Sequence, residues 1–246
     1  MPEITPSKYL VTGGWSQAPH LSEEQKEKYL ASTPPHLRDA RSKGTPSLGS
    51  GAIYPIEESE ITCDPFPIPS FWPVWYALDV GWKKTAAIWG AWDRESDCIY
   101  LWSEHYRGQA EPSIHAAAIR ARAEWIPGVI DPAARGRAQH DGNILVDNYR
   151  DLGLNLTNAK NAVDSGIDEV FQRLSTGRLK VFTTMRNFLA EYRLYRRDEK
   201  GKIVKEFDHL MDSTRYLCQS PDIAITKPVY EGEANRNRTR NSLTGY

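Results

Sequence analysis

The sequence predicts an α/β fold, in which a mixed central sheet is flanked by helices. Three short apolar runs, at residues 75–80, 85–93 and 98–106, are separated by turn-forming residues, and this pattern predicts an antiparallel meander of three strands. After the meander, short apolar segments alternate with helical patterns as far as residue 218. Such alternation is typical of helices packed on the faces of one sheet. A hydrophobic content of 40% is sufficient for the core of this domain.

The elements that follow the meander are predicted from hydrophobic spacing and from the positions of Gly and Pro. Short buried strands are expected at residues 128–132, 154–157 and 179–182. Helices are expected over residues 112–125, 143–152, 167–175, 185–195 and 208–218, and a hairpin over residues 195–207.

Residues 1–73 differ in composition from the rest of the chain. Eleven prolines interrupt this stretch, which therefore predicts a lead-in that needs a neighbour to pack on. Within it, one helix is expected over residues 22–32, with Ser22 as its cap and Gln25 three residues later, and a second over residues 35–43. The central domain is then expected over residues 74–220, followed by a basic, flexible tail at residues 221–246.

The formal net charge of −1 conceals a basic cluster. Residues 178–205 contain nine Lys or Arg and only three Asp or Glu, and three further arginines alternate in the tail. Such a cluster favours a polyanionic partner, including nucleic acid. A solvated helix and hairpin with basic flanks would have the same composition, so charge alone leaves both interpretations open.

Several classes of protein are excluded by composition and motifs. The three cysteines are odd in number and widely spaced, which argues against a disulfide framework and a cysteine zinc site. No apolar run approaches the roughly 20 residues that cross a bilayer, and the N-terminus lacks a signal-peptide pattern. The sequence has no HExxH motif and no Gly-x-Ser-x-Gly elbow, which disfavours zinc and serine hydrolases. We expect a soluble, cytoplasmic-type protein without a membrane partner.

Three acids occupy positions at which a metal site can be built. Asp79 ends the first predicted strand, Asp131 ends the fourth, and Asp212 lies in the last helix, with Asp208 one turn before it. Divalent cations such as Mg²⁺ prefer oxygen ligands, and two of them can clamp the attacking and leaving oxygens of a phosphoryl displacement. A single strand-ending Asp is more often a turn former, so the joint arrangement carries the hypothesis.

Four stretches of the chain resemble the nuclease domain of phage terminase large subunits, which has an RNase H-like fold. They are YALDVGWKKTAAIWGAWD (76–93), IDPAARGRAQHDG (130–142), YRRDEKGKIVKEFDHLMDSTRY (195–216) and an upstream stretch at residues 18–55. The last is similar to the segment that joins the motor ATPase to the nuclease. The resemblance covers residues 18–220, and it implies an endonuclease that cuts concatemeric double-stranded viral DNA during genome packaging, with Mg²⁺ or Mn²⁺ as a two-ion cofactor.

The resemblance also implies roles for individual residues. Asp79, Asp131 and Asp212 match the metal-binding, catalytic acids. Asp208 could add a ligand through water or cap the helix, and His209 could contact phosphate or assist proton transfer. The residues expected to contact DNA are Lys83, Lys84, Arg135, Arg137, Arg193, Arg196, Arg197, Lys200, Lys202 and Lys205. Most tryptophans fall inside strands and are expected in the core; Trp82, in the loop beside Asp79, is the exception.

The chain has no GxxxxGK[ST] phosphate loop, so we expect no ATP site and a resemblance to the C-terminal part of such subunits only. By resemblance, the partners would be double-stranded DNA, the portal protein, the small terminase subunit and the ATPase domain, in the host cytoplasm and transiently at the procapsid portal. Two alternatives remain open. The domain could be a DNA-gripping or portal-docking module with a silent nuclease, or another RNase H-like nuclease such as a junction resolvase.

Overall fold

The computed structural model describes residues 51–132, 145–198 and 201–228, together with residues 3–5, 8–9, 14–15, 18–31 and 42. The chain divides into two compact units. One, which we call the sheet unit, comprises residues 61–187 and 209–246. The other, the N-terminal unit, comprises residues 1–60 and 188–208. None of the described helices combines the length and the apolar character of a membrane-spanning segment.

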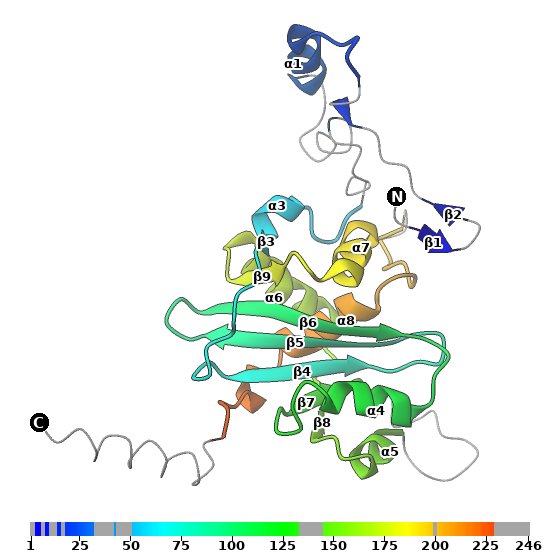
Figure 1. Cartoon of the computed structure of the whole chain (residues 1–246), viewed down its shortest axis with the longest axis vertical. Coiled ribbons are helices and arrows are strands. Elements are labelled where there is room, and N and C mark those ends of the chain that lie inside the picture. Colours follow the sequence, from blue (N-terminus) through cyan, green and yellow to red (C-terminus); the bar gives the residue numbers. More distant parts are fainter. Residues whose placement is uncertain are drawn as a thin grey trace, which may run out of the picture. The chain divides into compact units, whose positions relative to one another are not determined.

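The sheet unit is built on a seven-stranded sheet (Figure 1). Its strands lie in the order β3-β9-β6-β5-β4-β7-β8. They are β3 (Thr62–Cys63), β4 (Val74–Asp79), β5 (Thr85–Asp93), β6 (Cys98–Arg107), β7 (Gly128–Ile130), β8 (Leu156–Asn158) and β9 (Leu179–Phe182).

The predicted meander is confirmed. Strand β5 pairs antiparallel with both β4 and β6, with a register shift at Trp89/Gly90 in the second pairing. The remaining strands extend the sheet by parallel pairing, β7 on β4 and β8 on β7 at one side, β9 on β6 and β3 on β9 at the other. The sheet is therefore mixed, as expected, and β3 adds to its edge a strand that the sequence does not predict.

Helices cover both faces of the sheet, because alternate residues of the central strands point to opposite sides. On one face, Tyr76, Leu78 and Trp89 share a core with residues of α4 (Pro112–Arg120) and α5 (Leu145–Asp151). On the other, α8 (His209–Cys218) packs on β4 and β5, and α6 (Val163–Ser175) packs on α8. Helix α4 ends five residues before the predicted end at residue 125.

Two contacts of the central strand β4 determine how the core packs. A Cβ at Gly128 would lie 2.3 Å from the Tyr76 ring, so only glycine lets β7 pair beneath that ring. Trp75 is fully buried, and its indole N–H donates to the Leu217 carbonyl at 3.0 Å, which fixes α8 against β4.

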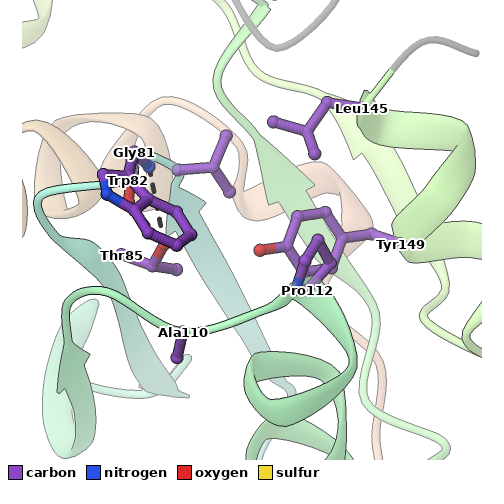
Figure 2. A pocket seen from close by; sticks show the side chains of 8 residues that line it. Gly81, Trp82, Thr85, Ala110, Pro112, Leu145 and Tyr149 are labelled. Carbon is purple, nitrogen blue, oxygen red and sulfur yellow. Dashed lines mark hydrogen bonds between the residues drawn. The ribbon is translucent and has the colours of Figure 1, made fainter. Parts of the chain in front are cut away.

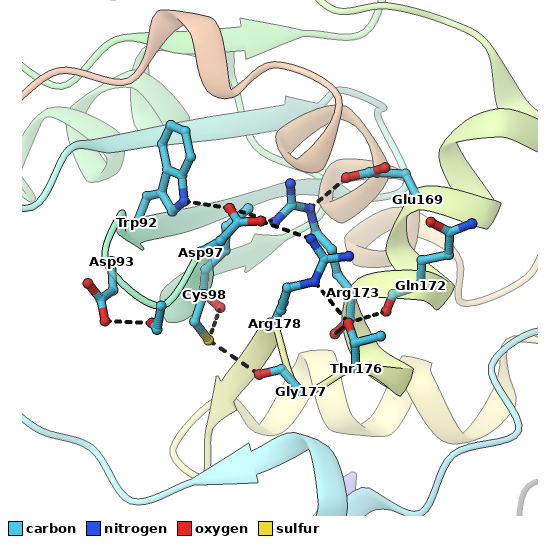
Figure 3. A network of polar contacts seen from close by, with 12 residues as sticks. Trp92, Asp93, Asp97, Cys98, Glu169, Gln172, Arg173, Thr176, Gly177 and Arg178 are labelled. Carbon is cyan, nitrogen blue, oxygen red and sulfur yellow. Dashed lines mark hydrogen bonds and ion pairs between the residues drawn. The ribbon is translucent and has the colours of Figure 1, made fainter.

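A polar network anchors the turn between β5 and β6 (Figure 3). Asp97, at a φ of 50°, accepts hydrogen bonds from the Trp92 indole at 3.0 Å and from Arg178 at 2.8 Å. Arg173 of α6 lies 3.6 Å from the same carboxylate and pairs with Glu169 at 2.6 Å. Burial raises the pKa of Asp97, but these hydrogen bonds and positive charges outweigh it and hold that pKa below its usual value.

The N-terminal unit contains shorter elements. They are β1 (Glu3–Thr5), β2 (Lys8–Tyr9) and α1 (Glu23–Ala31), followed by α3 (Glu58–Ile61) and α7 (Arg186–Leu194), which begin or end at its boundaries. The predicted cap of α1 is confirmed, since Gln25 N–H donates to Ser22 Oγ at 3.3 Å and Ser22 N–H donates to Gln25 Oε1 at 2.9 Å. The helix expected at residues 35–43 lies outside the described residues, apart from Ser42.

The hairpin predicted at residues 195–207 is present as a short turn. Arg197 and Ile203 form an antiparallel bridge, and Asp198 N–H donates to the Lys202 carbonyl at 2.7 Å. Tyr54 packs against the rings of Tyr192 and Tyr195 in the same unit, with centroids 6.2 and 5.5 Å away.

A pair of histidines joins α4 to β6. His105 Nε2 lies 2.9 Å from His115 Nδ1, a distance at which one neutral ring donates to the other. Burial, and then the charges of His115, Arg122 and Arg107, lower the pKa of His105 from 6.5 to about 4, and burial also lowers the pKa of His115.

This pair predicts an acid-sensitive stability. A histidine whose pKa is lowered by folding binds fewer protons in the native state than in the unfolded state between pH 6.5 and about 4. The free energy of unfolding should therefore fall as the pH drops through this window, and His105→Gln should make that fall shallower in denaturant titrations. His20→Gln, at an exposed histidine before α1, is the control. Equal slopes for His105→Gln and the wild type would contradict the prediction.

Candidate active site

Two of the predicted acids lie side by side at the ends of two neighbouring strands of the sheet. Strands β4 and β7 pair in parallel with Leu78 opposite Ile130, so Asp79 and Asp131 leave the sheet at adjacent strand ends. The Asp131 amide donates to the Leu78 carbonyl at 3.0 Å and continues the pairing for one residue. Carboxyl ends of neighbouring parallel strands are where ligands converge in α/β proteins.

Helix α8 brings further polar side chains to the same strand ends. His209, Asp212 and Tyr216 are three and four residues apart in sequence, so they share one face of the helix. The His209 Nδ1–H donates to Asp79 Oδ2 at 2.8 Å, and the Tyr216 hydroxyl donates to Asp131 Oδ1 at 3.2 Å. Both strand-end carboxylates are thus hydrogen-bonded to the same helix.

The three acids interact electrostatically. Burial raises the pKa of Asp79, and the negative charges of Asp212 and Asp131 raise it further, whereas hydrogen bonding to His209 and the charge of His209 lower it. Burial and then the charge of Asp131 raise the pKa of the Tyr216 phenol. The negative charges of the acids oppose one another in this partly buried site, and a cation would relieve the repulsion.

Asp212 has a buried cationic partner. Arg215 NH2 lies 3.1 Å from Asp212 Oδ1, and the Arg215 side chain is only 2% exposed. Its guanidinium also lies over the Tyr216 ring, 4.5 Å from the centroid. This ion pair connects the third acid to the interior of the sheet unit.

The donor chemistry of the site fits an oxygen-preferring divalent cation, because the negative charges of Asp131 and Asp212 act on the Asp79 carboxylate at the end of β4. In the described parts of the chain, however, no three side chains of His, Cys, Asp or Glu are grouped tightly enough to enclose a metal ion. The structure brings Asp79, Asp131, Asp212 and His209 into electrostatic contact, and their roles as ligands stay a prediction.

The other predicted site residues are distributed more widely. Asp208 precedes α8, lies in the N-terminal unit, and is paired with Lys205 at 3.0 Å. Arg193 forms two hydrogen bonds with Glu58, at 2.6 and 2.7 Å, so its guanidinium already has a carboxylate partner. Lys84 Nζ lies 4.4 Å from the centre of the Tyr106 ring, whereas Lys83 is exposed.

The remaining predicted DNA contacts are in part exposed and in part not described. Arg196 and Lys202 are exposed in the hairpin, and Arg197 NH1 donates to the Gly201 carbonyl at 3.0 Å. Arg135, Arg137 and Lys200 lie outside the described residues. DNA binding by all of these residues stays a prediction.

The structure adds two residues that the sequence analysis did not single out. Tyr216 contacts Asp131, and Arg215 pairs with Asp212. Both were detectable in principle, because they follow Asp212 by four and three residues and so lie beside it on a helix. Which strand-end acid Tyr216 would reach depends on the packing of α8 and has no signal in the sequence.

Comparisons with known proteins point in one direction. The sequence profile of the terminase RNase H-like domain family matches residues 77–220. The large terminase subunit of Enterobacteria phage LP7 is 37% identical over 210 residues, which cover 81% of this chain and 44% of that protein. The chain thus spans less than half the length of this curated relative.

Solved structures show the same fold. The nuclease domain of the large terminase of P22 has a TM-score of 0.68 and 34% identity, covering 73% of this chain and 97% of that one. The large terminase nuclease of thermophilic phage G20c with bound magnesium has a TM-score of 0.51 and 14% identity, covering 70% and 98%. At that identity the likeness concerns the fold alone. The predicted RNase H-like fold is confirmed.

Proposed function

Because this chain belongs to the terminase RNase H-like domain family, we propose that it is a divalent-metal-dependent endonuclease that cuts concatemeric double-stranded viral DNA during genome packaging. One observation carries the proposal: Asp79 and Asp131 end adjacent parallel strands, and the helix that bears Asp212 is hydrogen-bonded to both. Acids from three separate elements are the equipment that metal-assisted phosphodiester hydrolysis requires.

The proposed cofactor is a pair of Mg²⁺ or Mn²⁺ ions held by Asp79, Asp131 and Asp212, with Asp208 as a further ligand through water. The G20c nuclease, whose fold is similar, binds magnesium in one structure and cobalt in another, which supports a divalent metal in this fold. When bound, such ions supply an activated water and stabilise the charge that develops on the phosphate.

The chain's own residues orient the acids and the DNA. His209 holds the Asp79 carboxylate and Tyr216 holds that of Asp131, so each can present its other oxygen to a ligand. Lys83, Lys84, the two arginines after Asp131 and the basic residues of 193–205 contact the phosphate backbone in this proposal. Contacts of this kind position DNA without reading its sequence.

The partners and the organisation of the whole protein are part of the proposal. The relative from phage LP7 is a large terminase subunit, of which this chain spans 44%. We therefore propose that residues 1–73 lead in from an ATPase domain, that residues 74–220 form the nuclease and that residues 221–246 form a basic tail. The portal protein and the small subunit would be partners, at the procapsid portal in the host cytoplasm.

A second candidate function has one observation in its favour. His209 and Tyr216 each occupy an oxygen of a proposed metal ligand, and the acids of the described chain do not form a metal cage. Both observations are also expected of a domain that grips DNA or docks on the portal and whose nuclease is silent. Catalysis would then require the motor domain, and the isolated chain would bind DNA without cutting it.

Cleavage of a supercoiled plasmid distinguishes the two. We expect nicked and then linear DNA with Mg²⁺ or Mn²⁺ and intact plasmid with EDTA. The control variant is Asp93→Asn, since Asp93 also ends a strand, but β5 runs antiparallel to β4 and Asp93 lies at the opposite end of the strands from Asp79. Metal-dependent cutting by both the wild type and this control supports the nuclease. DNA binding without any cutting supports the gripping module.

A further inference from the structure

A pocket of about 410 Å³ opens immediately beyond the proposed catalytic acids (Figure 2). Asp79 is the last residue of β4, and the next three residues enter the pocket wall. The opposite walls come from the start of α4, at Pro112, and from α5, at Leu145 and Tyr149. The pocket wall therefore begins one residue after Asp79 in the chain, and the pocket volume lies in the usual range of small-ligand sites.

Trp82 is an unusually exposed aromatic residue at the rim of this pocket. The residue is 66% exposed, whereas Trp75 and Trp89 are fully buried in the sheet. Figure 2 shows its indole on one side of the pocket and the Tyr149 ring on the other, with the Tyr149 hydroxyl directed inward. The Tyr149 ring is only 2% exposed and closes the far side of an apolar slot, in which the indole offers the exposed aromatic face on which a flat ring can stack.

The loop that bears Trp82 is held rigidly. The Gln109 amide donates to the Trp82 carbonyl at 2.9 Å, and the Thr85 hydroxyl donates to the Gly81 carbonyl at 3.1 Å. A Cβ at Gly108 would lie 2.1 Å from the Lys83 carbonyl oxygen, so the loop and the turn after β6 are in direct contact. Because these contacts fix the backbone of the loop, little backbone ordering entropy opposes stacking on the exposed indole.

The charges around the slot favour a nucleic acid over an apolar peptide. Lys83 follows Trp82 and is exposed, and Arg107, paired with Thr85 across the sheet, is exposed on the adjacent strand. Cations beside an aromatic platform match the two parts of a DNA strand, since the cations bind the phosphate backbone and the aromatic ring stacks on the base.

We propose that this slot binds one unstacked nucleobase of the DNA strand whose backbone lies at Asp79 and Asp131, with Trp82 as the stacking residue. The inference rests on the proposed nuclease function and adds a base-binding subsite to it. Taking a base out of a duplex costs free energy, and the cost is smallest where the base is already unpaired. DNA with a local bubble should therefore be a better substrate than fully paired DNA.

Binding in EDTA tests the subsite without any cleavage. Fluorescence anisotropy would compare an oligothymidine with a strand of equal length made of abasic deoxyribose units. Trp82→Ala should weaken binding of the oligothymidine by about tenfold to a hundredfold and leave that of the abasic strand unchanged. Trp82→Phe should retain much of the affinity. The matched control is Phe71→Ala, because Phe71 is 74% exposed but does not line this pocket.

The outcomes separate this inference from the proposed function. If Trp82→Ala binds oligothymidine as tightly as the wild type, or weakens both strands equally, the base subsite is wrong even if the wild type cuts plasmid. If the base-dependent loss is seen but the wild type cuts neither plasmid nor a bubbled duplex, the subsite stands and the nuclease proposal fails. A stronger preference for bubbled over paired duplex in the wild type than in Trp82→Ala supports both.

Discussion

Asp131→Asn is expected to reduce metal-dependent plasmid cleavage by roughly a thousandfold or more, because the charge stabilisation that a divalent ion supplies is worth several kcal/mol. The amide cannot hold a cation as a carboxylate does. The fold should survive, since Asn is isosteric with Asp and its side-chain oxygen can still accept the hydrogen bond from Tyr216.

Three measurements make this result specific. DNA binding in EDTA and the melting temperature should match those of the wild type within error. Asp93→Asn, which replaces the acid that ends β5 at the opposite end of the strands, should cut normally. Wild-type rates in Asp131→Asn would mean that the acids at the ends of β4 and β7 are not the catalytic centre, and the residue assignments above would be wrong.

Sequence reasoning succeeded where local pattern determines structure. The meander was predictable because three apolar runs are separated by short polar turns, and the cap of α1 because Ser22 and Gln25 have capping-box spacing. The positions of Asp79 and Asp131 followed from the same pattern, since each acid ends an apolar run. Adjacent strand ends were then a consequence of parallel pairing.

It failed where structure depends on partners distant in sequence. Strand β3 is two residues long and pairs with β9, more than a hundred residues later, so it has no periodicity to detect. The ion pair between Arg193 and Glu58 was likewise not predicted, because the two residues are 135 positions apart in sequence, and DNA contact by Arg193 stays a prediction. Charge composition predicts a surface potential, but it does not show which cations already have a carboxylate partner.

The two strand-end acids also show how stability and function compete at this site. Burial and neighbouring acids raise the pKa of Asp79, so its ionised form is less favourable in the folded chain than in water. The hydrogen bond from His209 and the charge of His209 offset part of this cost in the absence of a cation. An arrangement that is electrostatically unfavourable by itself is common at sites that bind a charged ligand.

Arg215 is where we expect the largest effect on stability. Its side chain is 2% exposed and pairs with Asp212, so Arg215→Ala would leave a partly buried carboxylate without its guanidinium and create a cavity. Breaking one side of such a pair typically costs about 3–5 kcal/mol. Denaturant unfolding followed by circular dichroism should show a loss of this size. Control substitutions on the exposed hairpin, such as Lys202→Ala, should change stability little.

A double-variant cycle separates charge from packing. Arg215→Met keeps most of the buried stem, which lies so close to α6 that a Cβ at Gly166 would be 2.3 Å from Arg215 Cγ. If the lost ion pair with Asp212 causes the destabilisation, Arg215→Met should still be destabilised, and combining it with Asp212→Asn should recover much of the stability, because replacing both partners is often neutral. Full stability of Arg215→Met alone would show instead that Arg215 acts through packing and that its ion pair with Asp212 contributes nothing to the fold.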